Sequence, residues 1–368
     1  MKTICLNMIV KNESHVIKRC LESVKSFIDY WVIFDTGSTD ETGTLIREEL
    51  KKIPGELHER PWVNFAHNRN EALRAALGKA NYIFFIDADE YLTVTKPFNP
   101  SEWDKDFYMI KAKTKNSSFF HPNIVKDDPG WNWEGVIHEC ISHHKKMDGE
   151  ILLNVHMNRP QDGARSRDPN TYLKDIVILQ EAAKKEPWNA RHIFYLAQTY
   201  SGLQDGPSAL KYYQKRALMD GDEDELFWSL FRIAYLQETQ GADPQTVIAS
   251  YCRAHQQKPD RAEPLERLAH YYNTHRCPSL AYIIAKFGVS IKMPEALSCD
   301  FYPWVYEYGL LIQLADAALA LGFAKEAANY YQELLIKPTL IEHLKPCIHR
   351  QLAIAQRKQR LQETEDFL

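Results

Sequence analysis

The chain has 368 residues, a formal net charge of −4 and a mean hydropathy of −0.44. No stretch approaches the roughly 20 apolar residues that a membrane-spanning helix requires, so we expect no transmembrane segment. The balance of charges argues against a protein held on nucleic acid by a broad basic surface. The seven cysteines form no C-x-x-C pair and the N-terminus makes a poor signal peptide, so we expect a reduced, cytoplasmic protein.

The first half of the chain alternates strand-like and helix-like segments. Apolar runs rich in β-branched and aromatic residues predict strands, and the segments between them have helical periodicity. The strands are expected at 3–10, 30–34 and 81–86, and the helices at 13–27, 41–52 and 68–77. This order predicts a doubly wound α/β layer, in which the wholly apolar third strand lies at the buried centre.

Two local expectations accompany this layer. The S-x-x-E pattern from Ser38 to Glu41 predicts a capping box at the start of the second helix. Further along, strand-like segments at 107–112 and 151–156 enclose a stretch, 113–135, that we interpret as loop. We expect its part up to Gly130 to act as a mobile lid over a ligand.

After about Pro169 the strand signals stop, and the sequence becomes rich in Ala, Leu and Tyr. It also repeats: small and aromatic residues recur in one frame, as in tetratricopeptide helix pairs, with an irregular helical bundle as the alternative. The recurring sets are Leu196, Ala197, Tyr200 and Ala209; Leu268, Ala269, Tyr272 and Ala281; Leu314, Ala315, Ala327 and Tyr331; and, more faintly, Ala234, Tyr251 and Ala254. We therefore expect an α/β domain over residues 1–165 and an α-helical repeat domain over 166–368.

Polar residues follow each predicted strand of the first half. Asn12 and Glu13 follow the first, Asp35 the second, and Asp87 and Asp89 the third. In open α/β sheets ligands bind at these carboxyl ends. Asp87 and Asp89 are two residues apart and point to one side of an extended chain, where paired carboxylates suit Mg²⁺ or Mn²⁺ and a diphosphate partner. A solvated turn is the plain alternative.

Six short segments carry a family resemblance, in family order. The first half resembles a family 2 glycosyltransferase of the GT-A fold, a Rossmann-like mixed sheet that handles nucleotide-diphospho-sugars. The matching segments are 8–13, 20–23, 32–40, 66–73, 85–90 and 135–139. With the helical tail, the chain is similar to repeat-bearing bacterial glycosyltransferases, including peptide S-glycosyltransferases of the SunS type.

The resemblance implies an activity and its components. The expected reaction is transfer of a sugar from a nucleotide-sugar donor, a UDP-sugar, to a protein, peptide or glycan acceptor, with inversion. The resemblance also implies Mn²⁺ or Mg²⁺ as cofactor. We expect the helical repeats to recruit the acceptor or to build a homodimer.

It also implies donor-site residues. Asn12 and Glu13 are expected beside the nucleoside, with Glu13 towards the ribose. Asp35 is expected to accept a hydrogen bond from the uracil N–H, and Arg69 to reach the base or diphosphate. Asp87 would contact ribose or metal and Asp89 would bind the metal. His156 matches the histidine that closes the family's catalytic domain and is a candidate third metal ligand; its alternative is a buried structural histidine.

The transfer needs a base to take the proton of the acceptor O–H or S–H. Glu139 is our candidate catalytic base, and His138 would position it or replace it. Glu134, Asp127 and Asp128 are the other candidates. Trp131 and Trp133 flank this segment and offer flat faces to a sugar or peptide, with core packing as the alternative.

Two other classes of function are weighed against transfer. One is a non-catalytic scaffold that binds a nucleotide-sugar and uses its repeats for protein interaction. The other is a nucleotidyltransferase, which also uses paired carboxylates and Mg²⁺. The chain has no Gly-rich phosphate loop near its N-terminus, which disfavours the second.

Overall fold

The computed structural model describes residues 2–96, 99–114, 118–294 and 302–365. The described chain divides after Asp205 into two compact units. The first unit contains all the β-strands and the first helices that follow them. The second unit is helical.

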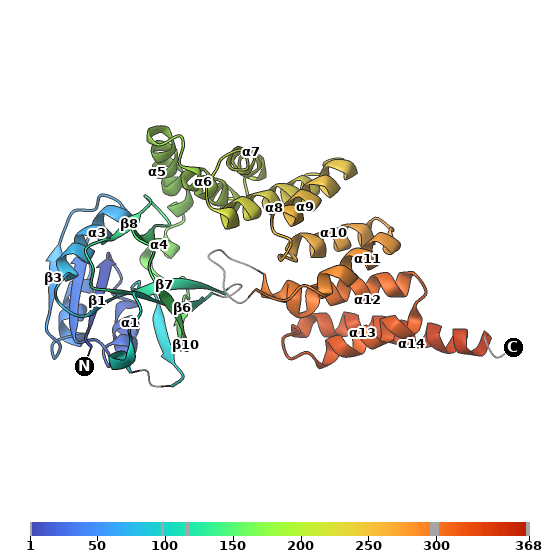
Figure 1. Ribbon diagram of the computed structural model, residues 1–368, viewed down its shortest axis with the longest axis horizontal. Helices are drawn as coiled ribbons and strands as arrows, with labels where there is room; N and C mark the ends of the chain where they lie inside the picture. The colour runs from blue at the N-terminus through green and yellow to red at the C-terminus, as the bar shows by residue number, and fades with distance from the viewer. Residues whose placement is uncertain (1, 97–98, 115–117, 295–301, 366–368) are drawn as a thin grey trace. The chain divides into compact units, whose positions relative to one another are not determined.

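A mixed sheet of eight strands forms the centre of the first unit, in the order β3-β2-β1-β4-β7-β6-β10-β5 (Figure 1). The strands are β1 (Ile4–Val10), β2 (Tyr30–Asp35), β3 (Gly55–Glu59), β4 (Tyr82–Phe85), β5 (Tyr91–Val94), β6 (Phe107–Lys113), β7 (Ser118–Lys126) and β10 (Gly149–Asn158). The first four pair in parallel, whereas β7 runs antiparallel to both β4 and β6. A separate hairpin joins β8 (Trp131–Glu134) to β9 (Cys140–His143).

Three helices connect the parallel strands. The chain steps from β1 outward to β2 and β3 through α1 (Ile17–Val24) and α2 (Thr42–Glu49), and then returns through α3 (Phe65–Ala76) to β4 on the far side of β1. Because such crossovers are right-handed, the outward and returning helices cover opposite faces of the sheet. The predicted doubly wound α/β layer is confirmed.

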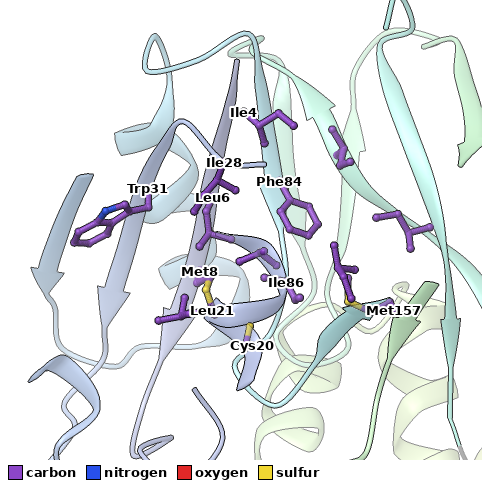
Figure 2. Close-up of a cluster of buried hydrophobic side chains, with 14 of the residues drawn as sticks. Ile4, Leu6, Met8, Cys20, Leu21, Ile28, Trp31, Phe84, Ile86 and Met157 are labelled. Atoms are coloured by element: carbon purple, nitrogen blue, oxygen red, sulfur yellow. The ribbon is translucent and has the colours of Figure 1, made fainter. Parts of the chain in front are cut away.

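Alternation along β1 explains why both faces are covered. Leu6 and Met8 point into one buried cluster with Cys20 and Leu21 of α1 and with Phe84 of β4 (Figure 2). The alternate residues of β1 face the other way, and Cys5 among them lies in a second cluster that is lined by α3. Each fully buried aliphatic side chain contributes about 1.5–3 kcal/mol, so the two clusters fix the register of the central strands.

The strand order reverses at the β1–β4 boundary. The segments that follow β1, β2 and β4 therefore all emerge at the same carboxyl edge of the sheet, where an open α/β sheet forms its binding crevice. This topology places the predicted polar segments together.

The predicted loop at 113–135 is wrong for most of its length. Residues 118–126 form β7, which lies between β4 and β6, and residues 131–134 form β8. Strand β7 was not predicted because it contains Pro122, and proline cannot donate a hydrogen bond within a sheet. In the fold Pro122 lies where the register of β6 and β7 shifts, so no regular ladder bond is lost there. Residues 118–126 of the predicted lid are therefore part of an ordered central strand. Residues 115–117 of the predicted lid lie outside the described residues.

The predicted capping box is also wrong. The N-cap of α2 is Glu41, whose side chain makes no capping hydrogen bond. Instead Asp40 accepts a hydrogen bond from the Thr42 backbone N–H (3.1 Å). Ser38 is unavailable as a cap because its hydroxyl accepts from the backbone N–H of Asn12 (2.9 Å).

All described regular elements after β10 are helical. In the first unit these are α4 (Ala164–Arg167), α5 (Thr171–Lys185) and α6 (Ala190–Gly202). In the second they are α7 (Gly206–Arg216), α8 (Glu223–Thr239), α9 (Pro244–Gln257), α10 (Glu263–Thr274), α11 (Pro278–Val289), α12 (Leu310–Ala320), α13 (Ala324–Ile336) and α14 (Lys345–Glu365), with short 3-10 or π turns before α12 and α14. Strands thus give way to helices close to the predicted domain boundary at 165, although α4 to α6 belong to the compact unit of the sheet.

The repeat frame read from the sequence coincides with the helix pairs. Its small residues are fully buried, which lets neighbouring helices approach closely. The alanines at 0% exposure are Ala197, Ala209, Ala234, Ala254, Ala269, Ala281, Ala315 and Ala327. Tyr213, Tyr251 and Tyr331 recur at one position of α7, α9 and α13 and are also buried. The tetratricopeptide-like arrangement is confirmed. Within the described residues, no helix combines the length and apolar character needed to cross a bilayer.

Candidate active site

The loops after β1 and β2 are joined by hydrogen bonds at the carboxyl edge of the sheet. Asn12 adopts a left-handed backbone (φ 57°), which Asn tolerates better than most residues. Its side-chain Oδ1 accepts from the Thr39 N–H (2.7 Å), and its own N–H donates to Ser38. Asn12 therefore fixes the two loops together, as an element of a nucleoside cradle would.

Asp35 lies beside the same two loops. It is the last residue of β2 and is buried. Its Oδ1 accepts from the backbone N–H groups of Gly37 (3.0 Å) and Ser38 (2.7 Å), which orients the carboxylate within a turn. The structure thus brings Asn12 and Asp35 together through Ser38.

Arg69 of α3 connects two other predicted site residues. Its Nη2 donates to Asp87 Oδ1 (2.6 Å), and its Nε donates to Glu139 Oε1. The guanidinium also lies 4.9 Å from the centre of the Trp133 ring. Arg69 is only 8% exposed, and a buried cation is tolerated when carboxylates pair with it. One side chain therefore links the end of β4 to the β8–β9 hairpin.

The charge of Arg69 also sets the state of Asp87. Shielding from water opposes ionisation of this carboxyl group, but the cations Arg69 and Arg159 outweigh that effect and lower the pKa of Asp87. The two carboxylates in turn raise the pKa of Arg69, although its burial acts the other way. Both shifts favour the charged forms of Asp87 and Arg69.

The pKa values of Asp89 and Glu13 shift in the opposite direction, upwards. Burial, then the repulsion of Asp87, raises the pKa of Asp89. Burial raises the pKa of Glu13 to about 7, opposed by a hydrogen bond from Ala164 and assisted by the charge of Asp89. The Ala164 N–H donates to the Glu13 carboxylate (3.1 Å), and the Gly163 N–H donates to Asp89 Oδ2 (3.3 Å). Negative charge is therefore in excess here, and a cation would relieve it.

The oxygen donors fit a divalent cation in part. Mg²⁺ commonly uses one or two protein carboxylates and takes its other ligands from substrate phosphate and water, which Asp89 and Asp87 satisfy. The described residues contain no group of three or more His, Cys, Asp or Glu side chains arranged as metal ligands. At the end of β4 the chain therefore offers the carboxylates of Asp87 and Asp89 as candidate ligands.

His156, the candidate third ligand, has a different environment. It lies on β10 opposite Lys111 of β6 and Thr93 of β5. Burial and the cations Lys113 and Lys111 lower the pKa of its ring. These neighbours are lysines rather than the carboxylates at the end of β4, so His156 as a metal ligand stays a prediction.

The loop 135–139 between β8 and β9 carries the candidate base. Glu139 immediately precedes β9, and the Arg69 ion pair directs its carboxylate towards the end of β4. His138 precedes it with a left-handed backbone (φ 52°), and its ring stacks on Tyr195 of α6 with centroids 4.3 Å apart. Shielding of the ring from water and the nearby cations Arg165 and Arg191 lower the pKa of His138 to about 4.

The other candidate bases make structural hydrogen bonds. Glu134 accepts from the Ser142 hydroxyl across the hairpin (2.6 Å). Asp127 accepts from the Gly78 N–H (2.9 Å), and Asp128 accepts from the Gly130 N–H (2.7 Å). None of these contacts involves Arg69. The geometry therefore favours Glu139 among the four carboxylates.

The two tryptophans of the hairpin lie in the core. Trp131 is 7% exposed and Trp133 is 4% exposed, and both belong to the cluster lined by α3. Trp133 packs edge-on against Phe85 with ring centroids 5.0 Å apart. Core packing, the alternative noted above, is the role that these contacts give them, and a role in acceptor binding stays a prediction.

Sequence reasoning did not assign roles to several residues of the site. Asn70, next to Arg69, makes two hydrogen bonds of 2.8 Å to the backbone N–H and C=O of Trp133 and so anchors the hairpin on α3. Glu90 is buried, forms an ion pair with Arg159 and accepts from the Asp87 N–H (3.0 Å). Asn70 lies in the matching segment 66–73 and Glu90 in the segment 85–90, so the family resemblance was the signal that could have found them.

Known proteins were compared with this chain. Residues 5–96 match the model of Glycosyl transferase family 2. The prophage-derived glycosyltransferase SunS of Bacillus subtilis is 38% identical over 58% of this chain and 53% of its own length, so the match spans about half of that relative. A TPR repeat-containing protein of Synechococcus elongatus is 26% identical over 79% of this chain and 76% of its own length.

Two further proteins are similar to parts of this chain. An uncharacterized glycosyltransferase of Rickettsia bellii is 34% identical over 25% of this chain and 29% of its own length. The C-terminal part of a TPR repeat-containing protein from Cytophaga hutchinsonii has a TM-score of 0.42 over 52% of this chain and 68% of that chain, at 13% identity. The N-terminal α/β domain is thus similar to glycosyltransferase family 2 over residues 5–96, and tetratricopeptide-like helix pairs follow it.

Proposed function

We propose that this chain transfers a sugar from a UDP-sugar to a protein, peptide or glycan acceptor, with the help of Mn²⁺ or Mg²⁺ and with inversion. The observation that carries the proposal is the Asp87–Arg69–Glu139 chain. It joins the carboxylates at the donor edge of the sheet to the loop that holds the candidate base, so donor and acceptor groups can meet there.

The donor nucleoside would lie in the cradle formed by the loops after β1 and β2. Asp35, already oriented by two backbone N–H groups, retains acceptor capacity for the N–H of a uracil ring. Asn12 holds the two loops that would enclose the base, and Glu13 follows it towards the ribose. This cradle supports a uridine nucleotide but does not select among sugars.

The metal would be held by Asp89 and Asp87, and the rest of its ligands would come from diphosphate and water. Its chemistry would be to stabilise the negative charge that develops on the departing diphosphate. Arg69, paired here with Asp87, supplies a second cation beside the same edge.

Glu139 would then take the proton of the acceptor. The acceptor oxygen or sulfur forms a bond to the anomeric carbon while the bond from that carbon to the diphosphate oxygen breaks, and the proton passes to the Glu139 carboxylate. Attack from the face opposite the leaving group inverts the anomeric centre. The repeats would recruit the acceptor; their use in a homodimer stays a prediction that the molar mass in solution would test.

The first test is thermal unfolding with UDP, with and without Mn²⁺. A ligand present at 100 times its dissociation constant stabilises the folded state by about 2.7 kcal/mol, which is a readable shift. We expect a Mn²⁺-dependent shift that Asp89→Ala abolishes and that Asp260→Ala, an exposed carboxylate of the repeats, leaves unchanged.

Two outcomes would contradict the proposal. The absence of a thermal shift with UDP or any other nucleotide would refute the proposed donor site. A normal shift without release of UDP from any UDP-sugar, over a panel of acceptors, would instead favour the non-catalytic scaffold that binds a nucleotide-sugar.

A further inference from the structure

Helix α6 makes direct contacts with the loop that carries the candidate base. Arg191 Nη2 donates to the backbone carbonyl of His138 (2.9 Å) and to the hydroxyl of Tyr195 (3.1 Å). Tyr195 stacks on the His138 ring at an interplanar angle of 14°, and the Arg191 guanidinium lies 4.7 Å from the centre of the Tyr195 ring. Guanidinium, phenol and imidazole thus form one continuous group, and two of its members belong to α6.

The loop at this contact has an unusual backbone. His138 has a φ of 52° and Gly135 a φ of 101°, both in the left-handed region. A non-glycine residue keeps such a conformation only where its surroundings impose it. The carbonyl bond from Arg191 and the ring stack from Tyr195 are contacts of that kind, because they hold both the backbone and the side chain of His138.

The position of His138 determines where Glu139 points, since the two residues are adjacent. The carboxylate of Glu139 is held from the other side by Arg69 of α3. Asn70 of the same helix fixes the strand that leads into the loop. The candidate base therefore stands between two supports, one from α3 and one from α6.

We propose that Tyr195 and Arg191 are positioning residues for Glu139, and that the helix bearing the first repeat frame is thereby a functional part of the transferase site. The inference rests on the proposed function, because it takes Glu139 as the base. It also explains why α6 belongs to the same compact unit as the sheet. The two residues act through the loop and touch neither donor nor acceptor in this account.

The test compares three variants of the full chain. Tyr195→Ala removes the stack, Tyr195→Phe retains it, and Tyr200→Ala alters another half-buried tyrosine of the same helix. The readouts are the thermal shift given by UDP with Mn²⁺, and kcat and KM for release of UDP from a UDP-sugar. A misplacement of about 1 Å can reduce a rate on the order of 10²-fold.

We expect Tyr195→Ala to retain the UDP shift and donor KM while kcat falls tenfold or more. Tyr195→Phe should restore a rate close to that of the wild type, and Tyr200→Ala should retain it. Because Tyr195 is proposed to act through Glu139, adding Tyr195→Ala to Glu139→Gln should reduce the residual rate no further.

The outcomes separate the two proposals. A wild-type kcat in Tyr195→Ala, an equal loss in Tyr200→Ala, or full additivity with Glu139→Gln would overturn the positioning role while leaving the transferase intact. If Tyr195→Ala unfolds, Arg191→Ala takes its place, and a wild-type kcat in that variant would also overturn the positioning role. Undetectable turnover in the wild type would overturn the proposed function itself, and the positioning role with it.

Discussion

Arg69 and Glu139 form an ion pair between α3 and the loop that follows β8, so the helix that returns to β4 also fixes the candidate base. A second donor group of Arg69, Nη2, holds Asp87 at the end of β4. A planar guanidinium can serve two carboxylates at once in a fixed geometry, which an ammonium group cannot do as well. The side chain of Arg69 thus sets the distance between Asp87, at the carboxyl edge of the sheet, and the candidate base Glu139.

Replacement of Arg69 should show this coupling. Arg69→Ala leaves two carboxylates without their cation, and breaking a buried pair in this way costs about 3–5 kcal/mol of unfolding free energy, with the lower end expected because Asp87 is partly exposed. Arg69→Lys should recover most stability but little activity. Urea denaturation and UDP release measure the two effects.

Arg74 provides the matched control for Arg69. It lies on the same helix and is exposed, so Arg74→Ala should change the unfolding free energy by less than about 0.5 kcal/mol. If Arg69→Ala were as mild as Arg74→Ala, the linking role of Arg69 would be refuted.

The base assignment predicts a separation of binding from turnover. Glu139→Gln retains the size of the side chain but cannot accept the acceptor's proton, and general bases contribute about 10²–10⁴-fold to such reactions. We expect an unchanged Mn²⁺-dependent UDP shift and a fall in kcat within that range. The control is Glu134→Gln, on strand β8, which should retain the wild-type kcat. A wild-type kcat in Glu139→Gln would mean that another group is the catalytic base.

The sequence was most informative where one physical signal dominated. The central strands β1, β2 and β4 are apolar runs, and their order alone implied the crevice that holds Asn12, Asp35 and Asp87. Strand β7 was not predicted because His121 and Pro122 interrupt its apolar pattern; in the fold Pro122 lies at a register shift. The repeat frame was readable because buried alanines recur at fixed positions in the helix pairs.

Contacts between distant segments could not be read in the same way. The hydrogen bond from Arg191 to His138 joins residues 53 positions apart. No local sequence pattern indicates that the left-handed backbone of His138 is held by a residue so far along the chain. Arg69 was placed in the donor site by resemblance, yet its link to Glu139 depends on how the hairpin docks on α3. His156 shows the converse, since a matching motif position lies among lysines in the fold.

Gly163 offers a way to perturb the carboxylate site without changing any charge. A Cβ added there would lie 2.9 Å from Asp89 Oδ2 and 3.0 Å from Asp89 Cβ, so Asp89 or its own loop must move. Gly163→Ala should therefore weaken the apparent affinity for Mn²⁺ in the UDP shift while UDP alone behaves as in the wild type. Gly206→Ala, where the nearest atom is the flexible Gln240 amide, is the control; an unaltered Mn²⁺ titration in Gly163→Ala would count against Asp89 as a metal ligand.

The repeats hold a buried carboxyl group that should make stability depend on pH. Glu266 is 3% exposed; burial, opposed by Arg267 and Gln313, raises its pKa to about 7. One of its oxygens accepts from Gln313, whereas Oε2 is buried without a partner among the described residues. The folded state therefore binds this proton more tightly than the unfolded chain, in which the pKa is about 4.5.

Because the folded chain holds the extra proton between these two values, the unfolding free energy should fall as the pH rises from about 4.5 to 7 and then level off. At about 1.4 kcal/mol per pKa unit, the contribution of Glu266 is about 3 kcal/mol. Glu266→Gln should remove that slope and stabilise the second unit at pH 8, where the wild type buries the charge. Urea midpoints of the wild type and of Glu266→Gln, each at pH 5 and pH 8, measure this contribution. Subtracting one protein from the other cancels the titration of Glu13 and Glu90, which both contain. Parallel pH profiles would show that Glu266 titrates in the folded state as it does in water.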